Sequence, residues 1–376
     1  MQDARSSFLR DAKNYSTLPI VRRFFVDTIT PIQLFQQLKT EAVFLLESMD
    51  SGSPWSRYSF VGLNPYGFIT EEAMVYKFQD RLTGDQLTHS DFKKIFEMAI
   101  DHLRVKPLET SVPFYGGAVG CLSYDAITRL EPISEHRNND LGLDKVSFLF
   151  CETILAFDHV DKELQIFHHV RLKGSETKEE ILERYDAAIR KMESLLAFLN
   201  DSSNNRNLFM HANDNKEVDF SRVRSNYEQP KFLKDVEKIK EYIRQGDIFQ
   251  AVLSQRFEVD LKVCGLDVYR ALRVINPSPY LFYLSFDGIE VVGSSPERLV
   301  QVQNGHVEIH PIAGTRKRGQ TKEEDDDLAA DLLQDEKELA EHYMLVDLAR
   351  NDVGRVAKYG TVKTPVLKEI GRFSHV

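Results

Sequence analysis

The sequence predicts an α+β fold in which large sheets are covered by helices. Three observations support this prediction. Runs rich in β-branched and aromatic residues are typical of strands, apolar residues at helical spacing predict long helices, and the two do not alternate as regular βαβ units. With 376 residues, 42% of them hydrophobic, the chain is long enough to bury a sizeable core.

The first half of the chain contains three predicted strands and one long helix. The strands are 60–69, 146–157 and 163–170. The helix covers 178–198, because its apolar residues return every three or four positions. The glycines of "YGGAVGC", from Tyr115 to Cys121, are interpreted as lying in or beside a strand, since they lack the spacing of a nucleotide-binding loop.

A polar, Asn-rich stretch at 200–229 predicts a connector between regions 1–199 and 230–376. After it, amphipathic and β-rich patterns predict further elements. These are a helix at 230–245, a strand at 248–259, a helix at 265–274, antiparallel strands within 280–314 with turns at "DG" and "NG", and a helical run at 323–356.

Composition argues against several classes of partner. A net charge of -10 repels the phosphate backbone, so we expect no nucleic acid. No segment has the roughly 18 consecutive apolar residues of a membrane span, and the first 25 residues lack the apolar core of a signal peptide. Cys121, Cys151 and Cys264 are far apart in apolar sequence, which is typical of buried reduced thiols. We therefore expect a soluble, cytoplasmic protein.

Two carboxylates in the last helical run form a candidate metal site. Glu338 and Glu341 are three positions apart, so both project from one side of the helix. Two carboxylates on a rigid face can hold magnesium, while water and substrate oxygens complete its octahedron. The alternative is an exposed acidic turn. The apolar residues that follow predict a buried helix and favour the metal site; they are Met344, Leu345, Val346 and Leu348.

Two further stretches carry candidate site residues. In "HPIAGTRKRG", from His310 to Gly319, a Gly-Thr turn precedes three cations, and Thr315 with Arg316 could hydrogen-bond a carboxylate. In "GSSPERLV", Glu297 follows a strand and is a candidate general acid. The alternatives are a basic surface loop for the first and a solvated turn for the second.

Taken together and in this order, the motifs resemble the chorismate-utilising enzymes, and within them the large subunits (component I) of anthranilate synthase. The motifs are "LLES", "SRYSF", "GDIFQAVLSQRF", "NPSPYLFY", "SSPERLV", "PIAGTR" and "DEKELAEHYMLVDLARNDVGR". The resemblance implies two large antiparallel or mixed β-sheets wrapped by helices, Mg2+ as cofactor, and chorismate as substrate. It also implies a hetero-oligomer in which a glutamine amidotransferase subunit, component II, delivers ammonia for tryptophan biosynthesis.

The resemblance assigns roles by position. Glu341 becomes the direct magnesium ligand with Glu338 beside it, and the metal holds the ring carboxylate of chorismate while the C4 hydroxyl leaves. Glu297 becomes the acid that protonates this hydroxyl. Thr315, in the Ala313–Gly314–Thr315 turn, binds the ring.

Two positions separate the subfamilies that the resemblance covers. Water-adding members have a lysine where Gln250 stands, and a glutamine cannot act as a base at neutral pH. Aminodeoxychorismate synthases often have a nucleophilic lysine where Ala313 stands. The resemblance therefore favours direct attack of ammonia at C2, followed by pyruvate elimination to anthranilate. The alternatives are an aminodeoxychorismate synthase component I of the folate pathway and a noncatalytic fragment that binds tryptophan or a partner.

Two motifs resemble the tryptophan feedback site of the anthranilate enzymes, one in each region. The implied inhibitor-binding residues are Glu47, Ser48, Asn276, Pro277, Ser278, Pro279 and Tyr280. The resemblance also implies that the family continues past Val376 through a Met-His pair, a carboxylate-binding turn and a second glutamate helix. We therefore expect the catalytic region 230–376 to be C-terminally incomplete and the chain as written to make little anthranilate.

Overall fold

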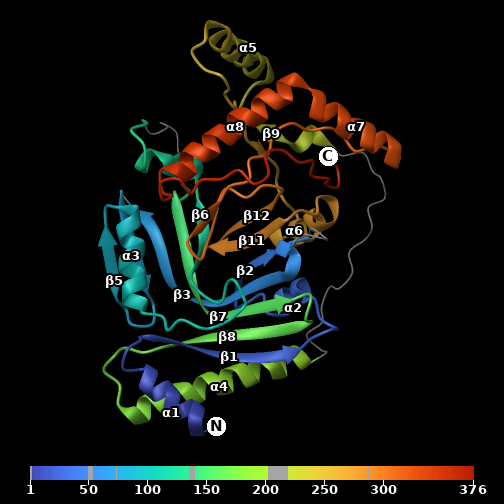
Figure 1. Ribbon diagram of the computed structural model, residues 1–376. Helices are drawn as coiled ribbons and strands as arrows, with labels where there is room; N and C mark the ends of the chain where they lie inside the picture. Colours follow the sequence, from blue (N-terminus) through green and yellow to red (C-terminus); the bar gives the residue numbers. More distant parts are fainter. Residues whose placement is uncertain (1, 50–53, 73, 135–139, 202–218, 287) are drawn as a thin grey trace. The chain divides into compact units, whose positions relative to one another are not determined.

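The computed structural model describes residues 2–49, 54–72, 74–134, 140–201, 219–286 and 288–376 (Figure 1). The chain forms two compact units, one of residues 1–206 with 268–376 and the other of residues 207–267. Residues 202–218 of the predicted connector lie outside the described residues. The functional division into 1–199 and 230–376 therefore stays a prediction.

One antiparallel sheet of ten strands dominates the first unit (Figure 1). Its main path runs β1-β8-β7-β3-β2-β11-β12, while β4 pairs with β3, β5 with β4, and β6 with β7. The strands are β1 (Thr17–Phe25), β2 (Ala42–Glu47), β3 (Tyr58–Glu72), β4 (Val75–Asp80), β5 (Gln86–His89), β6 (Ala118–Leu122), β7 (Val146–Asp158), β8 (Glu163–Arg171), β11 (Tyr280–Phe286) and β12 (Ile289–Ser295). The three strands predicted in the first half are confirmed as parts of β3, β7 and β8.

The first unit contains helices as well as this sheet, which confirms the α+β class. The helix predicted at 178–198 is α4 (Lys178–Asn200), and a capping box formed by Thr177 and Glu180 begins it. Apolar side chains of α1, β1, β8 and α4 pack in one cluster. The other helices are α1 (Gln2–Asp11), α2 (Pro31–Gln37), α3 (Phe92–Leu103), α6 (Gly265–Ile275), α7 (Lys322–Gln334) and α8 (Glu336–Gly354), with short 3-10 turns at Pro54–Arg57 and Tyr124–Arg129.

The core lies along the central strands, where aromatic side chains interdigitate. Phe44, Leu149, Ile154 and Phe167 are at most 1% exposed. Gly120 of β6 lets two backbones approach closely, because a Cβ there would lie 2.1 Å from the Ser147 carbonyl oxygen. The prediction that the "YGGAVGC" glycines lie in or beside a strand is confirmed, since β6 covers Ala118–Leu122.

The second unit contains α5 (Gln229–Gln245), a short 3-10 turn (Phe220–Arg222) and the strand pair β9 (Arg224–Ser225) with β10 (Phe257–Glu258). The helix predicted at 230–245 is confirmed. The strand predicted at 248–259 is wrong for most of its length, since only Phe257–Glu258 pairs with another strand in the described residues. A β-rich pattern becomes a strand only where a partner receives its backbone hydrogen bonds.

The strands of the described residues form the ten-stranded sheet, the β9–β10 pair and the pair β13 (Gln301–Gln303) with β14 (His306–Glu308). The resemblance implied two large sheets. The described chain instead has one large sheet and two short pairs, because β9 and β10 are two residues long and β13 and β14 are three residues long. The predicted turn at "NG" does join β13 to β14, while Asp287 of "DG" lies outside the described residues.

The helical run predicted at 323–356 is two helices, α7 and α8, which meet at Asp335. Asp335 has extended backbone angles, and its carboxylate accepts hydrogen bonds from the amides of Lys337 and Glu338. This N-cap satisfies amides that a helix start leaves unpaired, so it ends one helix and begins the next. The prediction that α8 is buried is also wrong, since Val346 is its one buried residue while Leu348 is 54% exposed.

The three cysteines are free, as predicted, but they are not all buried. Cys151 is buried, Cys121 is half-buried, and Cys264 is exposed. The prediction fails for Cys264 because its apolar neighbours Leu261 and Val263 are themselves exposed in the second unit. None of the helices that the structure describes is long and apolar enough to cross a membrane.

A buried histidine on β8 makes stability depend on pH. Burial lowers the pKa of His169 to about 4, and Gly116 packs against its Nε2. The unfolded chain therefore takes up this proton first, near pH 6.5. We expect stability to be complete above pH 6.5 and to fall by about 3 kcal/mol as the pH drops to about 4. Urea unfolding of the parent and of His169→Phe across this pH range measures the loss of stability. The loss should be smaller in the variant.

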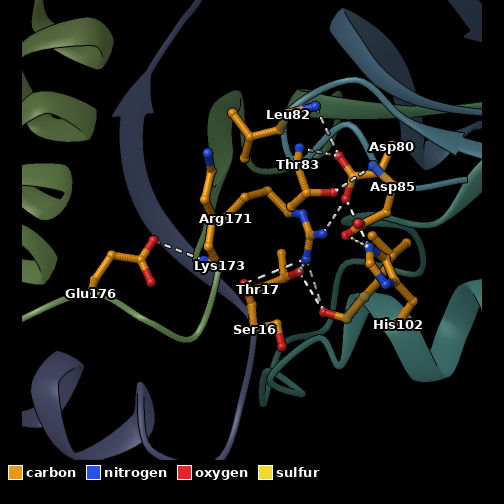
Figure 2. A network of polar contacts seen from close by, with 11 residues as sticks. Ser16, Thr17, Asp80, Leu82, Thr83, Asp85, His102, Arg171, Lys173 and Glu176 are labelled. Atoms are coloured by element: carbon orange, nitrogen blue, oxygen red, sulfur yellow. Dashed lines mark hydrogen bonds and ion pairs between the residues drawn. The ribbon is translucent and has the colours of Figure 1, made fainter.

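A polar network joins β1, β4, β8 and α3 (Figure 2). The buried carboxylate of Asp80 accepts from the Arg171 guanidinium, from His102 Nε2 at 3.1 Å and from the Leu82 amide at 2.9 Å. Arg171 also donates to Thr17 Oγ1 at 2.8 Å. Burial by itself would raise the pKa of Asp80, but Arg171 and these hydrogen bonds hold it below its usual value.

Candidate functional site

The predicted glycine turn and the carboxylate helix meet in a pocket of about 250 Å³ in the first unit. Leucine and alanine side chains of α7 form one wall, and charged side chains form much of the rest. The lining consists of Pro296, residues 311–318, residues 368–373 and Val376, with Asp325, Leu328, Ala329, Leu332 and Leu333 of α7 and Glu338, Leu339 and His342 of α8.

The turn lies directly against the carboxylate helix. Gly314 has a φ of +69°, which favours glycine. A Cβ at Gly314 would lie 3.1 Å from Glu338 Oε2 and 3.1 Å from Leu332 Cδ1. Glycine is therefore required twice, by the backbone angle and by the neighbouring carboxylate. The structure thus brings the Ala313–Gly314–Thr315 turn and Glu338 together.

Glu297 reaches the same turn from the end of β12. The Ser295 hydroxyl donates to the Glu297 carbonyl at 2.9 Å and accepts from its amide at 3.2 Å, which holds this backbone in a tight turn. The Glu297 carboxylate then accepts from the Ile312 amide at 3.2 Å. Glu297 is exposed, so it can exchange protons with water or a ligand. Glu297 is not among the residues that line the pocket, but its contact is to Ile312, which lines it.

The two glutamates of α8 provide hard oxygen donors. Glu338 lines the pocket with a side chain that is 20% exposed, and Glu341 is half-buried one turn along the helix. His342 Nε2 lies 2.7 Å from the Leu367 carbonyl, so this nitrogen is a donor and not a ligand. Within the described part of the chain, no group of three or more His, Cys, Asp or Glu could hold a metal ion. Magnesium needs only one or two protein carboxylates, so the donor set fits it.

A cluster of ion pairs among Asp325, Arg318 and Arg372 forms part of the pocket lining. Asp325, 8% exposed, accepts from Arg318 Nε at 2.8 Å and NH2 at 2.9 Å, from Arg372 and from the Gly319 amide at 2.9 Å. Gly319 is needed for this contact, because a Cβ there would lie 2.3 Å from the Asp325 amide nitrogen. The Arg318 partnership lowers the pKa of Asp325, which keeps the carboxylate ionised.

Gln250 belongs to the second unit, whereas the pocket is lined by residues of the first unit. It has no regular secondary structure there. Its predicted role as the position that distinguishes ammonia from water therefore stays a prediction.

The residues implied for inhibitor binding gather where β2 ends and β11 begins. Glu47 pairs with Leu281 across the sheet, and the Met49 amide donates to the Ser278 carbonyl at 3.0 Å. The Ser294 hydroxyl of β12 donates to the Asn276 carbonyl at 2.6 Å. The structure thus joins "LLES" to "NPSPY", although the two motifs are far apart in the sequence.

Buried side chains surround these residues, which we call the β2–β11 cluster. Glu47 is 6% exposed and accepts from Tyr269 Oη at 2.7 Å, while its other contact is Arg273 Nε at 2.8 Å. Burial raises the pKa of Glu47, and Arg273 and Tyr269 counteract part of that rise. Among the described residues, Ser48 Oγ is buried without a hydrogen-bond partner. A buried hydroxyl of this kind is a natural contact for a polar ligand atom.

Sequence reasoning missed Tyr269 and Arg273 as partners of Glu47. A signal existed, because the two are four positions apart in a predicted helix that leads directly into "NPSPY". It also missed the contacts of Arg316. Its guanidinium reaches Asp331 and Asp335, which no local pattern connects to the turn.

The chain matches the family described as chorismate binding enzyme over residues 44–376. It therefore belongs to the chorismate binding enzyme family.

Within this family, the chain is similar to component 1 of anthranilate synthase. It is 51% identical to that protein from Geobacillus stearothermophilus over 377 aligned residues, covering 100% of this chain and 74% of the relative. It is 47% identical to the Bacillus subtilis protein, covering 99% of this chain and 72% of the relative.

Two solved structures of chorismate-utilising enzymes are similar in fold to this chain. Anthranilate synthase component I from Streptococcus pneumoniae has 34% identity and a TM-score of 0.62, covering 81% of this chain and 63% of that one. The menaquinone-specific isochorismate synthase from Escherichia coli has 13% identity and a TM-score of 0.53, covering 94% of this chain and 68% of that one, and so shares the fold. The chain thus spans about two thirds to three quarters of the relatives' lengths.

Proposed function

We propose that the chain provides the chorismate site of an anthranilate synthase component I, which converts chorismate and ammonia to anthranilate and pyruvate in tryptophan biosynthesis. The observation that carries the proposal is the pocket in which the 313–315 turn meets Glu338, with the Glu297 carboxylate bonded to the adjacent Ile312 amide. A glutamine amidotransferase subunit supplies the ammonia in this proposal, and the reduced cysteines suit a cytoplasmic setting.

Each group has a distinct task in the proposed reaction. Glu297 donates a proton to the C4 hydroxyl, which leaves as water while ammonia attacks C2. The turn amides and Thr315 orient the ring, and the small Ala313 leaves no side-chain amine to attack in place of ammonia. Glu338 and Glu341 would hold Mg2+, which supplies positive charge next to the substrate carboxylate.

Product analysis tests the proposal. Because the chain spans 74% of the length of the Geobacillus stearothermophilus relative, it is extended to the full length of that relative for the assay. The extended protein is incubated with chorismate, MgCl2 and ammonium chloride, and products are separated by liquid chromatography with anthranilate fluorescence. Anthranilate and pyruvate in equal amounts are expected. Isochorismate as the main product would overturn the proposal, and 4-amino-4-deoxychorismate would support the folate-pathway alternative. Chorismate or tryptophan binding without any product would support the noncatalytic alternative.

Replacing the proposed direct ligand should weaken magnesium binding. Glu341→Gln removes one of two negative charges on a single helical turn, so Mg2+ affinity should fall about tenfold or more while the fold stays intact. Calorimetric titration with MgCl2 measures this. Glu336→Gln, an exposed change on the same helix, is the matched control and should bind like the parent. An unchanged magnesium affinity in Glu341→Gln would refute the ligand role.

We further propose that the β2–β11 cluster binds tryptophan as a feedback inhibitor, in which the buried Ser48 hydroxyl contacts the amino-acid end. Ser48→Phe would fill this space, so tryptophan affinity should fall by at least tenfold. Calorimetry on the folded protein measures the affinity. Ser175→Phe, at an exposed position, is the control. If Ser48→Phe binds tryptophan as well as the parent, the inhibitor site lies elsewhere.

A further inference from the structure

Arg316 lies between the substrate turn and the carboxylate helix. It follows Thr315 directly in the chain, and its Nε lies 2.7 Å from Asp331 Oδ2 on α7. Its NH2 lies 2.8 Å from Asp335 Oδ2 at the junction of α7 and α8. Two donors of one planar guanidinium thus bind α7 and the start of α8, and a lysine ammonium could not match this geometry.

Asp335 connects the Arg316 guanidinium to the first turn of α8. Its Oδ2 contacts Arg316, while its Oδ1 accepts from the amides of Lys337 at 3.0 Å and Glu338 at 3.2 Å. The position of the first turn of α8 therefore depends on a carboxylate that Arg316 orients. Arg316 Nη1 donates to the Thr315 carbonyl at 3.2 Å and also lies 3.9 Å from Glu338 Oε1.

The turn itself leaves little freedom at this point. Gly314, two residues before Arg316, packs against Glu338 and Leu332 so closely that a Cβ would meet both at 3.1 Å. A shift of the turn would therefore displace the Glu338 carboxylate, and a shift of α8 would displace the turn. Arg316 is the charged group that holds the two at this separation.

We propose that Arg316 is a positioning residue that couples the substrate turn to the metal-binding carboxylates. The proposal rests on the proposed function for its ligands, chorismate and Mg2+. It assigns Arg316 two opposing effects. Through Asp335 it aligns Glu338 with the turn, which favours chorismate, and through its charge at 3.9 Å it opposes a cation at Glu338 when no substrate is present.

The first experiment needs no ligand. Amide hydrogen exchange is measured for Arg316→Gln, Arg316→Lys and the parent. Without the guanidinium, the Asp335 cap is less well oriented, so exchange at Lys337 and Glu338 should rise about fivefold in Arg316→Gln and less in Arg316→Lys. Arg5→Gln, which removes the remote surface pair with Asp186, is the control and should leave these amides unchanged. Unchanged exchange in Arg316→Gln overturns the proposal.

The second experiment separates positioning from simple loss of structure. In calorimetry, Arg316→Gln should bind Mg2+ alone at least as tightly as the parent, yet bind chorismate in the presence of Mg2+ about tenfold more weakly. A merely damaged pocket would weaken both, and that outcome overturns the coupling. If the parent binds neither ligand while exchange responds as expected, the proposed function fails and the positioning of α8 by Arg316 stands.

Discussion

Replacing Arg171 with methionine should lower the free energy of unfolding by about 3–5 kcal/mol, because the variant leaves the Asp80 carboxylate buried without its cation. The side chains of Arg171 and Asp80 are 3% and 0% exposed, so water cannot replace the lost partner. The same change removes hydrogen bonds to Thr17 and to the Leu103 carbonyl, which tie β1 and α3 to the network. Urea denaturation followed by circular dichroism measures the loss.

Two controls make this result specific. Arg350→Gln removes an exposed pair with Asp347 and should cost no more than about 1 kcal/mol. Adding Asp80→Asn to Arg171→Met removes the unpaired charge, so the double variant should be less destabilised than the sum of the two single variants. Additive losses would mean that the two side chains do not stabilise the fold as a pair.

In the chain extended to the full length of its relative, Glu297→Gln should reduce the rate of anthranilate formation by about 10²- to 10⁴-fold, because an amide cannot donate the proton that the leaving hydroxyl needs. The amide oxygen can still accept from the Ile312 amide, so the turn should keep its place and chorismate affinity should change little. Initial rates from anthranilate fluorescence, beside chorismate affinity from calorimetry, separate the two quantities.

Glu323→Gln, an exposed change in the first turn of α7, controls for the loss of one carboxylate and should retain the parent rate. Glu297→Asp keeps a proton donor on a shorter side chain and should recover part of the rate. Retention of full activity by Glu297→Gln would show that another group protonates the leaving hydroxyl.

Local patterns predicted most elements of the fold. Runs rich in β-branched and aromatic residues predicted the strands that became β3, β7 and β8, and the 3.6-residue period predicted α4 and α5, because such patterns act over a few residues. They failed where a long-range partner decides. The 248–259 run had the composition of a strand, yet in the described residues only Phe257–Glu258 pairs. The pattern at 323–356 predicted one continuous helix. The Asp335 side chain instead caps the start of α8 and so divides the run into two helices.

The sequence by itself determined the helical neighbourhood of Glu338 and Glu341, the turn that contains Gly314, and, through its motifs, the family. Only the tertiary structure decided which of these segments meet. Glu47 lies 222 positions before Tyr269, and Glu297 reaches Ile312 across the β13–β14 pair. Helical spacing follows from backbone geometry within one turn, whereas contacts between distant segments form only when burial and hydrogen bonding in the assembled sheet outweigh the entropy of closing the chain.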